Sequence, residues 1–220
     1  KTNQSTETSW QAEAGPAQQQ GRVFISYSRK DVAFVRQLHQ DLHQSGIEAW
    51  VDWKGIPPTA DWRAEIEAAI SKSDAFLFLI SPDSLASKVC QQEIATAVRQ
   101  QKRLIPILHR ELNSQFPIPE QLTRYNWLFM RCQEELASTL PALVRAINTD
   151  LEWVHLHTLL LARAIEWERS RRDASYMLRG RALEQAERWL AEGSAGREPQ
   201  PTRLHLDYIQ ASRQRVTEYA

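Results

Sequence analysis

A run of apolar, β-type residues that ends abruptly in hydroxyl side chains constrains this chain more than any other feature. The stretch 22–28 has the sequence Arg-Val-Phe-Ile-Ser-Tyr-Ser, and charged residues and a helical pattern follow it. An uninterrupted apolar run is typical of a strand in a parallel sheet, because helices cover both faces. Ligands of open α/β sheets bind just beyond the carboxyl ends of such strands. We therefore expect Ser26, Ser28 and Arg29 where a phosphate or sugar binds; the alternative is that Asp31 caps the next helix and Arg29 is solvated.

Strands and helices alternate from residue 22 to residue 148. Helices of this length between strands predict right-handed crossovers and a parallel sheet. The pattern therefore predicts an α/β fold, a flavodoxin-like, doubly wound, five-stranded parallel sheet with strand order 2-1-3-4-5. The region 110–125 is rich in loop residues, so any helix there is short. The expected strands are 22–28, 48–53, 75–80, 103–108 and 127–130, the expected helices are 31–45, 61–73, 84–101 and 134–148, and 54–60 is a proline-containing loop.

The two ends of the chain differ in character from this alternating region. Residues 1–20 are rich in Gln, Ser, Thr and Ala, and such a segment buries too little surface to offset its ordering entropy, which predicts a disordered leader. After an α/β domain over 21–149, residues 150–220 form an α-helical appendage whose helices are apolar on more than one side and need partners. The chain stops inside a helical pattern without a cap, which suggests that it was cut from a longer protein.

Composition excludes several functional classes. Lys plus Arg (27) equals Asp plus Glu (27), so no overall field favours nucleic acid or an anionic membrane. The apolar stretches are too short to cross a bilayer, and the leader lacks the apolar core of a signal peptide. Two cysteines in unrelated contexts suit a reducing cytoplasm, and no spacing of His or Cys predicts a metal site. We expect a cytoplasmic protein without metal, nucleic acid or membrane.

Residues 22–148 resemble a Toll/interleukin-1 receptor (TIR) domain of the bacterial type. Several motifs in the right order carry the resemblance, and each alone would be weak. The appendage is similar, more loosely, to the helical spacer of bacterial TIR proteins that carry NTPase or WD-repeat modules. The motifs are Phe24-Ile25-Ser26-Tyr27-Ser28, Val51-Asp52 with the loop 53–60, Trp62 with Ile66 and Ala69-Ile70, Ser81-Pro82, and Ser87-x-x-Cys90-x-x-Glu93-x-x-x-Ala97.

The resemblance implies an NAD glycohydrolase activated by self-assembly with other TIR copies in a bacterial immune or conflict system. NAD is then the substrate, no separate cofactor is needed, and Glu93 is the catalytic residue. The nicotinamide of NAD is already a cationic leaving group, so bond breaking needs no general acid and builds an oxocarbenium ion on the ribose. A carboxylate in a water-poor cleft stabilises that charge. Without the resemblance, Glu93 would be interpreted as a solvated helix residue.

Substrate-binding roles follow for residues near the expected strand ends. Ser28 and Arg29 are expected to contact ribose hydroxyls and the pyrophosphate, for which Arg offers bidentate donors. Lys54 adds charge unless it is merely solvated, as loop lysines usually are. Trp53 and Trp62 flank the proline-containing loop and offer stacking surfaces; core packing is the alternative for Trp62.

Two nearby positions temper the enzymatic interpretation. Cys90 is expected to be a small buried hydrophobe, because no His or Lys adjoins it to stabilise a thiolate. Many NAD-cleaving relatives carry Trp directly before this Cys, whereas this chain has Val89, so the product, linear or cyclic ADP-ribose, stays open. Val89 favours the alternative of a non-catalytic TIR–TIR adaptor, while Glu93 and the 26–29 segment favour the enzyme.

A phosphoacceptor domain of the receiver type is disfavoured, because the first strand ends in Ser and Arg instead of acidic residues.

Overall fold

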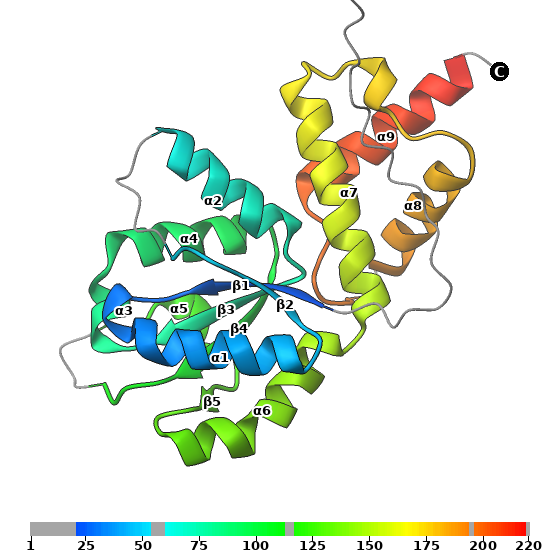
Figure 1. The fold of residues 1–220 in the computed structure, drawn as a ribbon. Coiled ribbons are helices and arrows are strands. Elements are labelled where there is room, and N and C mark those ends of the chain that lie inside the picture. Colours follow the sequence, from blue (N-terminus) through cyan, green and yellow to red (C-terminus); the bar gives the residue numbers. More distant parts are fainter. Residues whose placement is uncertain (1–20, 54–59, 113–116, 194–195, 219–220) are drawn as a thin grey trace, which may run out of the picture.

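The computed structural model describes residues 21–53, 60–112, 117–193 and 196–218. They form a parallel sheet with helices on both faces and a group of helices that packs beside it (Figure 1). The sheet region comprises β1 (Arg22–Ser26), η1 (Arg29–Asp31), α1 (Val32–Gln44), β2 (Glu48–Val51), α2 (Ala60–Lys72), β3 (Ala75–Ile80), α3 (Pro82–Ala86), α4 (Lys88–Arg99), β4 (Arg103–Leu108), α5 (Glu120–Thr123), β5 (Leu128–Phe129) and α6 (Gln133–Asn148). The C-terminal region comprises α7 (Leu151–Arg169), η2 (Ala174–Tyr176), α8 (Gly180–Gly193) and α9 (Arg203–Glu218).

The sheet has five strands, all parallel, in the order β2-β1-β3-β4-β5, which confirms the predicted fold and strand order. All six residues of β3 are buried, as its continuous apolar sequence predicts for a central strand covered on both faces. Strand β1 lies between β2 and β3, so its carboxyl end has a strand on either side at the edge where open α/β sheets bind ligands.

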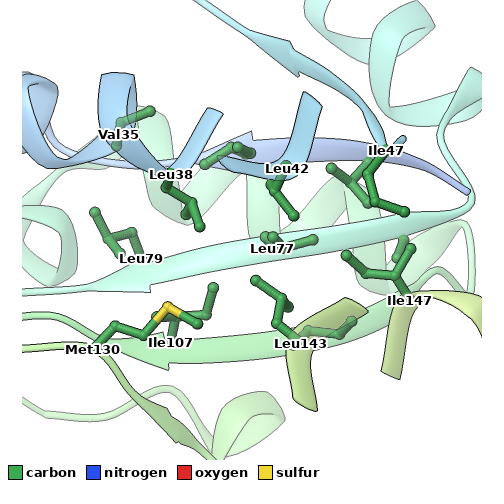
Figure 2. Packing of buried hydrophobic residues seen from close by; sticks show 14 of the residues in the cluster. Val35, Leu38, Leu42, Ile47, Leu77, Leu79, Ile107, Met130, Leu143 and Ile147 are labelled. Carbon is green, nitrogen blue, oxygen red and sulfur yellow. The ribbon is translucent and has the colours of Figure 1, made fainter. Parts of the chain in front are cut away.

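Successive residues of each strand enter two separate cores, because side chains alternate across a strand. Val23 and Ile25 of β1 belong to the core under α1 and α6, whereas Phe24 belongs to the core under α2 and α4. Figure 2 shows the first core, where Leu38 of α1 and Leu143 of α6 converge on the face of the sheet. Phe24 stacks on rings of both neighbouring strands in the second core. The helices α2 and α4, which carry the candidate site, therefore pack directly on the face of the sheet.

Some boundaries differ from those expected, for local reasons. The predicted helix 84–101 is divided into α3 and α4 at Ser87, whose extended backbone breaks the helix and whose hydroxyl caps α4 by accepting from the amide of Cys90. The predicted strand 22–28 ends at Ser26, because Ser28 caps the turn η1. The predicted strand 127–130 is reduced to the two residues of β5, and the helix found in the described part of the loop-rich stretch before it, α5, is short. The predicted loop 54–60 lies, up to residue 59, outside the described residues.

The C-terminal helices have their own core and also pack on the sheet region. Trp153, Trp167, Trp189 and Tyr208 are buried together between α7, α8 and α9. No helix among the described residues is long and apolar enough to cross a membrane.

A polar seam joins α7 to the amino-terminal edge of the sheet. The buried carboxylate of Asp74 accepts from the amide and the Nε of Arg22, at 2.9 and 3.2 Å, and its Oδ1 lies 3.0 Å from Nδ1 of His155. Thr158 also donates to the carbonyl of Ser73 over 3.3 Å. His155 is thus engaged at this seam, on the edge of the sheet opposite to the carboxyl ends of the strands.

Candidate active site

Glu93 lies on the buried face of α4 and reaches the carboxyl end of β1. Its oxygen Oε2 accepts a hydrogen bond of 2.5 Å from the hydroxyl of Ser26, the last residue of that strand. Only 7% of Glu93 and 1% of Ser26 are exposed. The chain therefore folds so that a carboxylate is held, largely out of water, at the edge where open α/β sheets bind ligands.

The surroundings of Glu93 raise the pKa of its carboxyl group into the neutral range. Burial raises the pKa of Glu93 to about 7; the Ser26 hydrogen bond opposes this shift, and the negative charge of Asp52 adds to it. Near pH 7 the group therefore exists in both protonation states. A carboxyl group perturbed in this way at the wall of a cleft is a candidate for catalysis.

The cleft beside Glu93 has a volume of about 240 Å³ and lies between α2 and α4. This volume is just below the range typical of sites for drug-sized ligands, so the described walls suit a nucleoside better than a whole dinucleotide. Val89 gives the cleft an aliphatic patch, and Arg63 and Arg99 give it positive charge. The lining residues are Arg63, Ile66, Glu67, Val89, Gln92, Glu93, Thr96 and Arg99.

A larger hollow, of about 670 Å³, lies near the polar seam, away from Glu93. Its cationic side chains already have acidic partners: Arg22 pairs with Asp74 and Arg197 with Glu192, at 3.2 and 2.8 Å. We place the candidate site at the smaller cleft, because that cleft contains the buried carboxylate whose ionisation is shifted, whereas size alone identifies no chemistry.

The predicted binding residues that the structure describes do not line this cleft. The hydroxyl of Ser28 caps η1 by accepting from the amide of Lys30 over 3.4 Å. Arg29 is largely exposed, and its guanidinium lies 3.9 Å from the carboxylate of Asp52. Trp53 is 43% exposed. The side chain of Trp62 and the whole of Lys54 lie outside the described residues, and the binding roles of all five stay predictions.

Cys90 is buried one turn before Glu93, as the sequence predicts for a small hydrophobe. Its thiol donates to the carbonyl of Tyr27 over 3.4 Å. Burial, together with the charge of Glu93, raises the pKa of Cys90 to about 11. The thiol therefore stays protonated at neutral pH and is a poor nucleophile.

An ionic network around the buried carboxylate of Asp31, at the same edge of the sheet, corrects the interpretation of Asp31 as a helix cap. Its side chain makes no capping hydrogen bond. It accepts instead from the hydroxyl of Ser81 at 2.6 Å and from Nε of Arg110 at 2.7 Å. Arg110 also donates to Asp83 at 2.5 Å, and Lys30 pairs with the same carboxylate. These residues follow β1, β3 and β4, so the predicted strand order already placed them side by side.

Sequence reasoning missed two other features of the site. The sequence predicts Ser26 in the polar cluster at the end of β1 as a contact for phosphate or sugar, and it gives no sign that Ser26 is the partner of Glu93. Arg63 had no signal in the sequence, because it is a single charge among several on α2. Its place beside Glu93 depends on how α2 packs on α4.

An α/β domain with an acidic side chain buried at the carboxyl edge of its sheet belongs to a class that includes many nucleotide-binding folds. Within that class, residues 23–144, more than half of the chain, match the TIR domain family, and the chain belongs to this family.

The solved structures that are similar to this chain include the following three, and each alignment covers little more than half of the chain. One is the TIR domain of a Toll-related receptor from Hydra magnipapillata, at 24% identity and a TM-score of 0.48, covering 57% of this chain and 96% of that one. The second is a prokaryotic SEFIR domain, at 24% identity and a TM-score of 0.46, and the alignment covers 58% of this chain and 92% of that one. The third is a CMP N-glycosidase from Clostridium botulinum, at 19% identity and a TM-score of 0.41, and the alignment covers 55% of this chain and 98% of that one.

Proposed function

We propose that this chain is a TIR-domain NAD glycohydrolase that cleaves the bond between nicotinamide and ribose, with Glu93 as its catalytic residue. The observation that carries the proposal is the carboxylate of Glu93, buried at the wall of a cleft and held by Ser26 over 2.5 Å. Membership of the TIR family supports NAD as the substrate, because the family resemblance implies this activity.

The proposed reaction uses the charge that NAD already carries. When the glycosidic C–N bond breaks, its electron pair goes to the pyridinium ring, nicotinamide leaves as a neutral molecule, and positive charge develops on the ribose. The ionised carboxylate of Glu93 stabilises that charge, and its effect is larger in a cleft that excludes water. A water molecule then attacks the anomeric carbon and releases a proton, which yields ADP-ribose. Attack by the adenine of the same molecule instead gives a cyclic ADP-ribose.

The biological setting is part of the same proposal. The resemblance to bacterial TIR proteins suggests a cytoplasmic enzyme of an immune or conflict system, which acts after self-assembly with other TIR copies. Such a setting is consistent with an active site whose described walls form a cleft of about 240 Å³, smaller than sites for drug-sized ligands. Further walls are then expected from a neighbouring copy.

The burial of Glu93 also favours a second candidate, a TIR–TIR interaction module without activity. Only 7% of this residue is exposed, and Val89 offers no aromatic surface on which a nucleotide ring can stack. In that case Glu93 is only a buried polar group of the domain. The two candidates differ in one measurable property, the release of nicotinamide.

The test is to incubate the concentrated protein with NAD and to measure nicotinamide by chromatography. We expect release by the wild type and at least a hundredfold loss in Glu93→Gln, which keeps the size of the side chain and removes its charge. Glu65→Gln is the matched control, because Glu65 is exposed on α2 and does not line the cleft. Absence of release from the wild type, even when clustered, would favour the interaction module.

A further inference from the structure

We propose that Ser26 is a positioning residue for Glu93: its hydroxyl fixes the carboxylate in one orientation and favours its ionised form. The catalytic consequence rests on the proposed function, whereas the effect of Ser26 on the ionisation of Glu93 does not.

The geometry gives the hydroxyl of Ser26 a fixed place beside the carboxylate of Glu93. It is the last residue of β1 and is paired with Phe78 in the register of the sheet, so its backbone is held on the central strands. Its Oγ lies 2.5 Å from Oε2 of Glu93, and both residues are buried. An ionised carboxylate only accepts hydrogen bonds, so the serine is the donor. A donor held by the sheet can orient the carboxylate without moving when charge develops on the substrate.

The other groups that face Glu93 do not replace this donor. Asp52, which follows β2, opposes ionisation of Glu93 through its negative charge. The thiol of Cys90 on α4 has a pKa raised to about 11, and burial raises that of the Tyr27 phenol, so both are neutral at pH 7. The charged residues that line the cleft with Glu93 are Arg63 and Glu67 from α2 and Arg99 from α4, and Arg99 is paired with Glu67. Ser26 is thus the group that offsets burial.

The test is the pH dependence of NAD cleavage by Ser26→Ala. Activity requires ionised Glu93, so the wild type is expected to gain activity as pH rises through about 7. Without the donor, the midpoint should move to higher pH by about one unit, because a hydrogen bond to a charged group contributes that much. Activity at pH 7 should then fall several-fold and recover at pH 9. Asp52→Asn should move the midpoint in the opposite direction.

Two controls separate positioning from a general structural effect. Ser73→Ala removes another buried serine, at the opposite edge of the sheet, and should leave the midpoint unchanged. Ser26→Thr retains a hydroxyl and should restore most of the wild-type profile. If Ser26→Ala does not fold, Ser26→Val compared with Ser26→Thr still decides, since the two side chains have nearly the same shape and differ in the hydroxyl. Equal midpoints for these two variants would overturn the role of Ser26.

Titration of the Glu93 carboxyl carbon by NMR, assigned with Glu93→Gln, makes the proposal independent of catalysis. One outcome is that the titration midpoint of Glu93 moves to higher pH in Ser26→Ala although the protein never cleaves NAD. That result would support the effect of Ser26 on the ionisation of Glu93 and reject the proposed NAD activity. A titration midpoint within about 0.3 units of the wild type would overturn the role of Ser26, even in an active enzyme.

Discussion

The guanidinium of Arg110 donates from Nε to the carboxylate of Asp31 over 2.7 Å, although 79 residues separate the two in sequence. The side chain of Asp31 is only 1% exposed, so this contact neutralises a charge that has almost no access to water. Because Arg110 follows β4 and Asp31 precedes α1, the pair connects two loops across the carboxyl edge of the sheet. These loops border the edge at which Ser26 and Glu93 meet.

Replacing Arg110 with Ala should therefore destabilise the protein by about 2 kcal/mol, because the buried carboxylate of Asp31 loses a charged partner. The matched control is Lys30→Ala, which removes a cation from the more exposed Asp83 and should cost clearly less than the loss of Arg110. Urea denaturation of the three proteins at pH 7 gives both values. Equal, small losses would mean that water replaces the guanidinium at Asp31.

The sheet could be predicted from sequence, because each central strand is a short apolar run between helices with turn residues at its ends. The order of the strands then follows from the rules for parallel sheets. The contact between Ser26 and Glu93 could not be predicted. A helical residue's direction depends on where its helix begins, and the pattern over 84–101 indicated one helix instead of two. The break at Ser87 sets the phase of α4 and turns Glu93 toward β1.

Asp31 shows a second limit of sequence reasoning. An Asp directly before a helix has the local pattern of a cap, and that pattern is the same whether or not the side chain turns away. Ser81 and Arg110 decide its direction, and both come from distant parts of the chain. The substrate-binding roles of Ser28, Arg29 and Trp53 stay predictions, since they concern a ligand.

Glu93 should make the stability of the protein depend on pH in a defined direction. Its pKa is raised in the folded state to about 7, from 4.5. The folded state thus binds this proton more tightly than the unfolded state does. Ionisation of Glu93 therefore lowers the free energy of unfolding by nothing below pH 4.5 and by up to roughly 3 kcal/mol above pH 7. Glu93→Gln should be more stable than the wild type at pH 8.5, and this advantage should disappear at pH 4.5.

Urea denaturation at the two pH values tests this expectation, with Glu65→Gln as the control for loss of an exposed carboxylate. If Glu93→Gln gives the same difference in the free energy of unfolding at both pH values, Glu93 titrates as an ordinary exposed glutamate, and the description of its burial is wrong.

Arg63 should contribute to the affinity for substrate through its positive charge. It lines the cleft with Glu93, and a pyrophosphate beside it gains charge-assisted hydrogen bonds. Arg63→Ala should raise the KM for NAD about tenfold and leave kcat nearly unchanged. Nicotinamide riboside, which has no phosphate, should be cleaved equally by both proteins. Arg145→Ala removes an exposed arginine of α6, outside the cleft, and serves as the control. Equal losses for both substrates would assign Arg63 a structural role.

Self-assembly should raise the specific activity if a neighbouring copy completes the site. The described walls enclose only about 240 Å³ beside Glu93, and the exposed Trp53 follows the edge strand β2, where a second domain has access. Specific activity should therefore rise over two decades of protein concentration, and further when the protein is clustered on a bead or vesicle. Trp53→Ala should reduce self-association measured by light scattering without NAD, whereas Phe129→Ala, an exposed aromatic on the opposite edge strand β5, should not. A specific activity that is high and independent of concentration would mean that one copy holds the complete site, since dilution separates copies but leaves the interior of each domain unchanged.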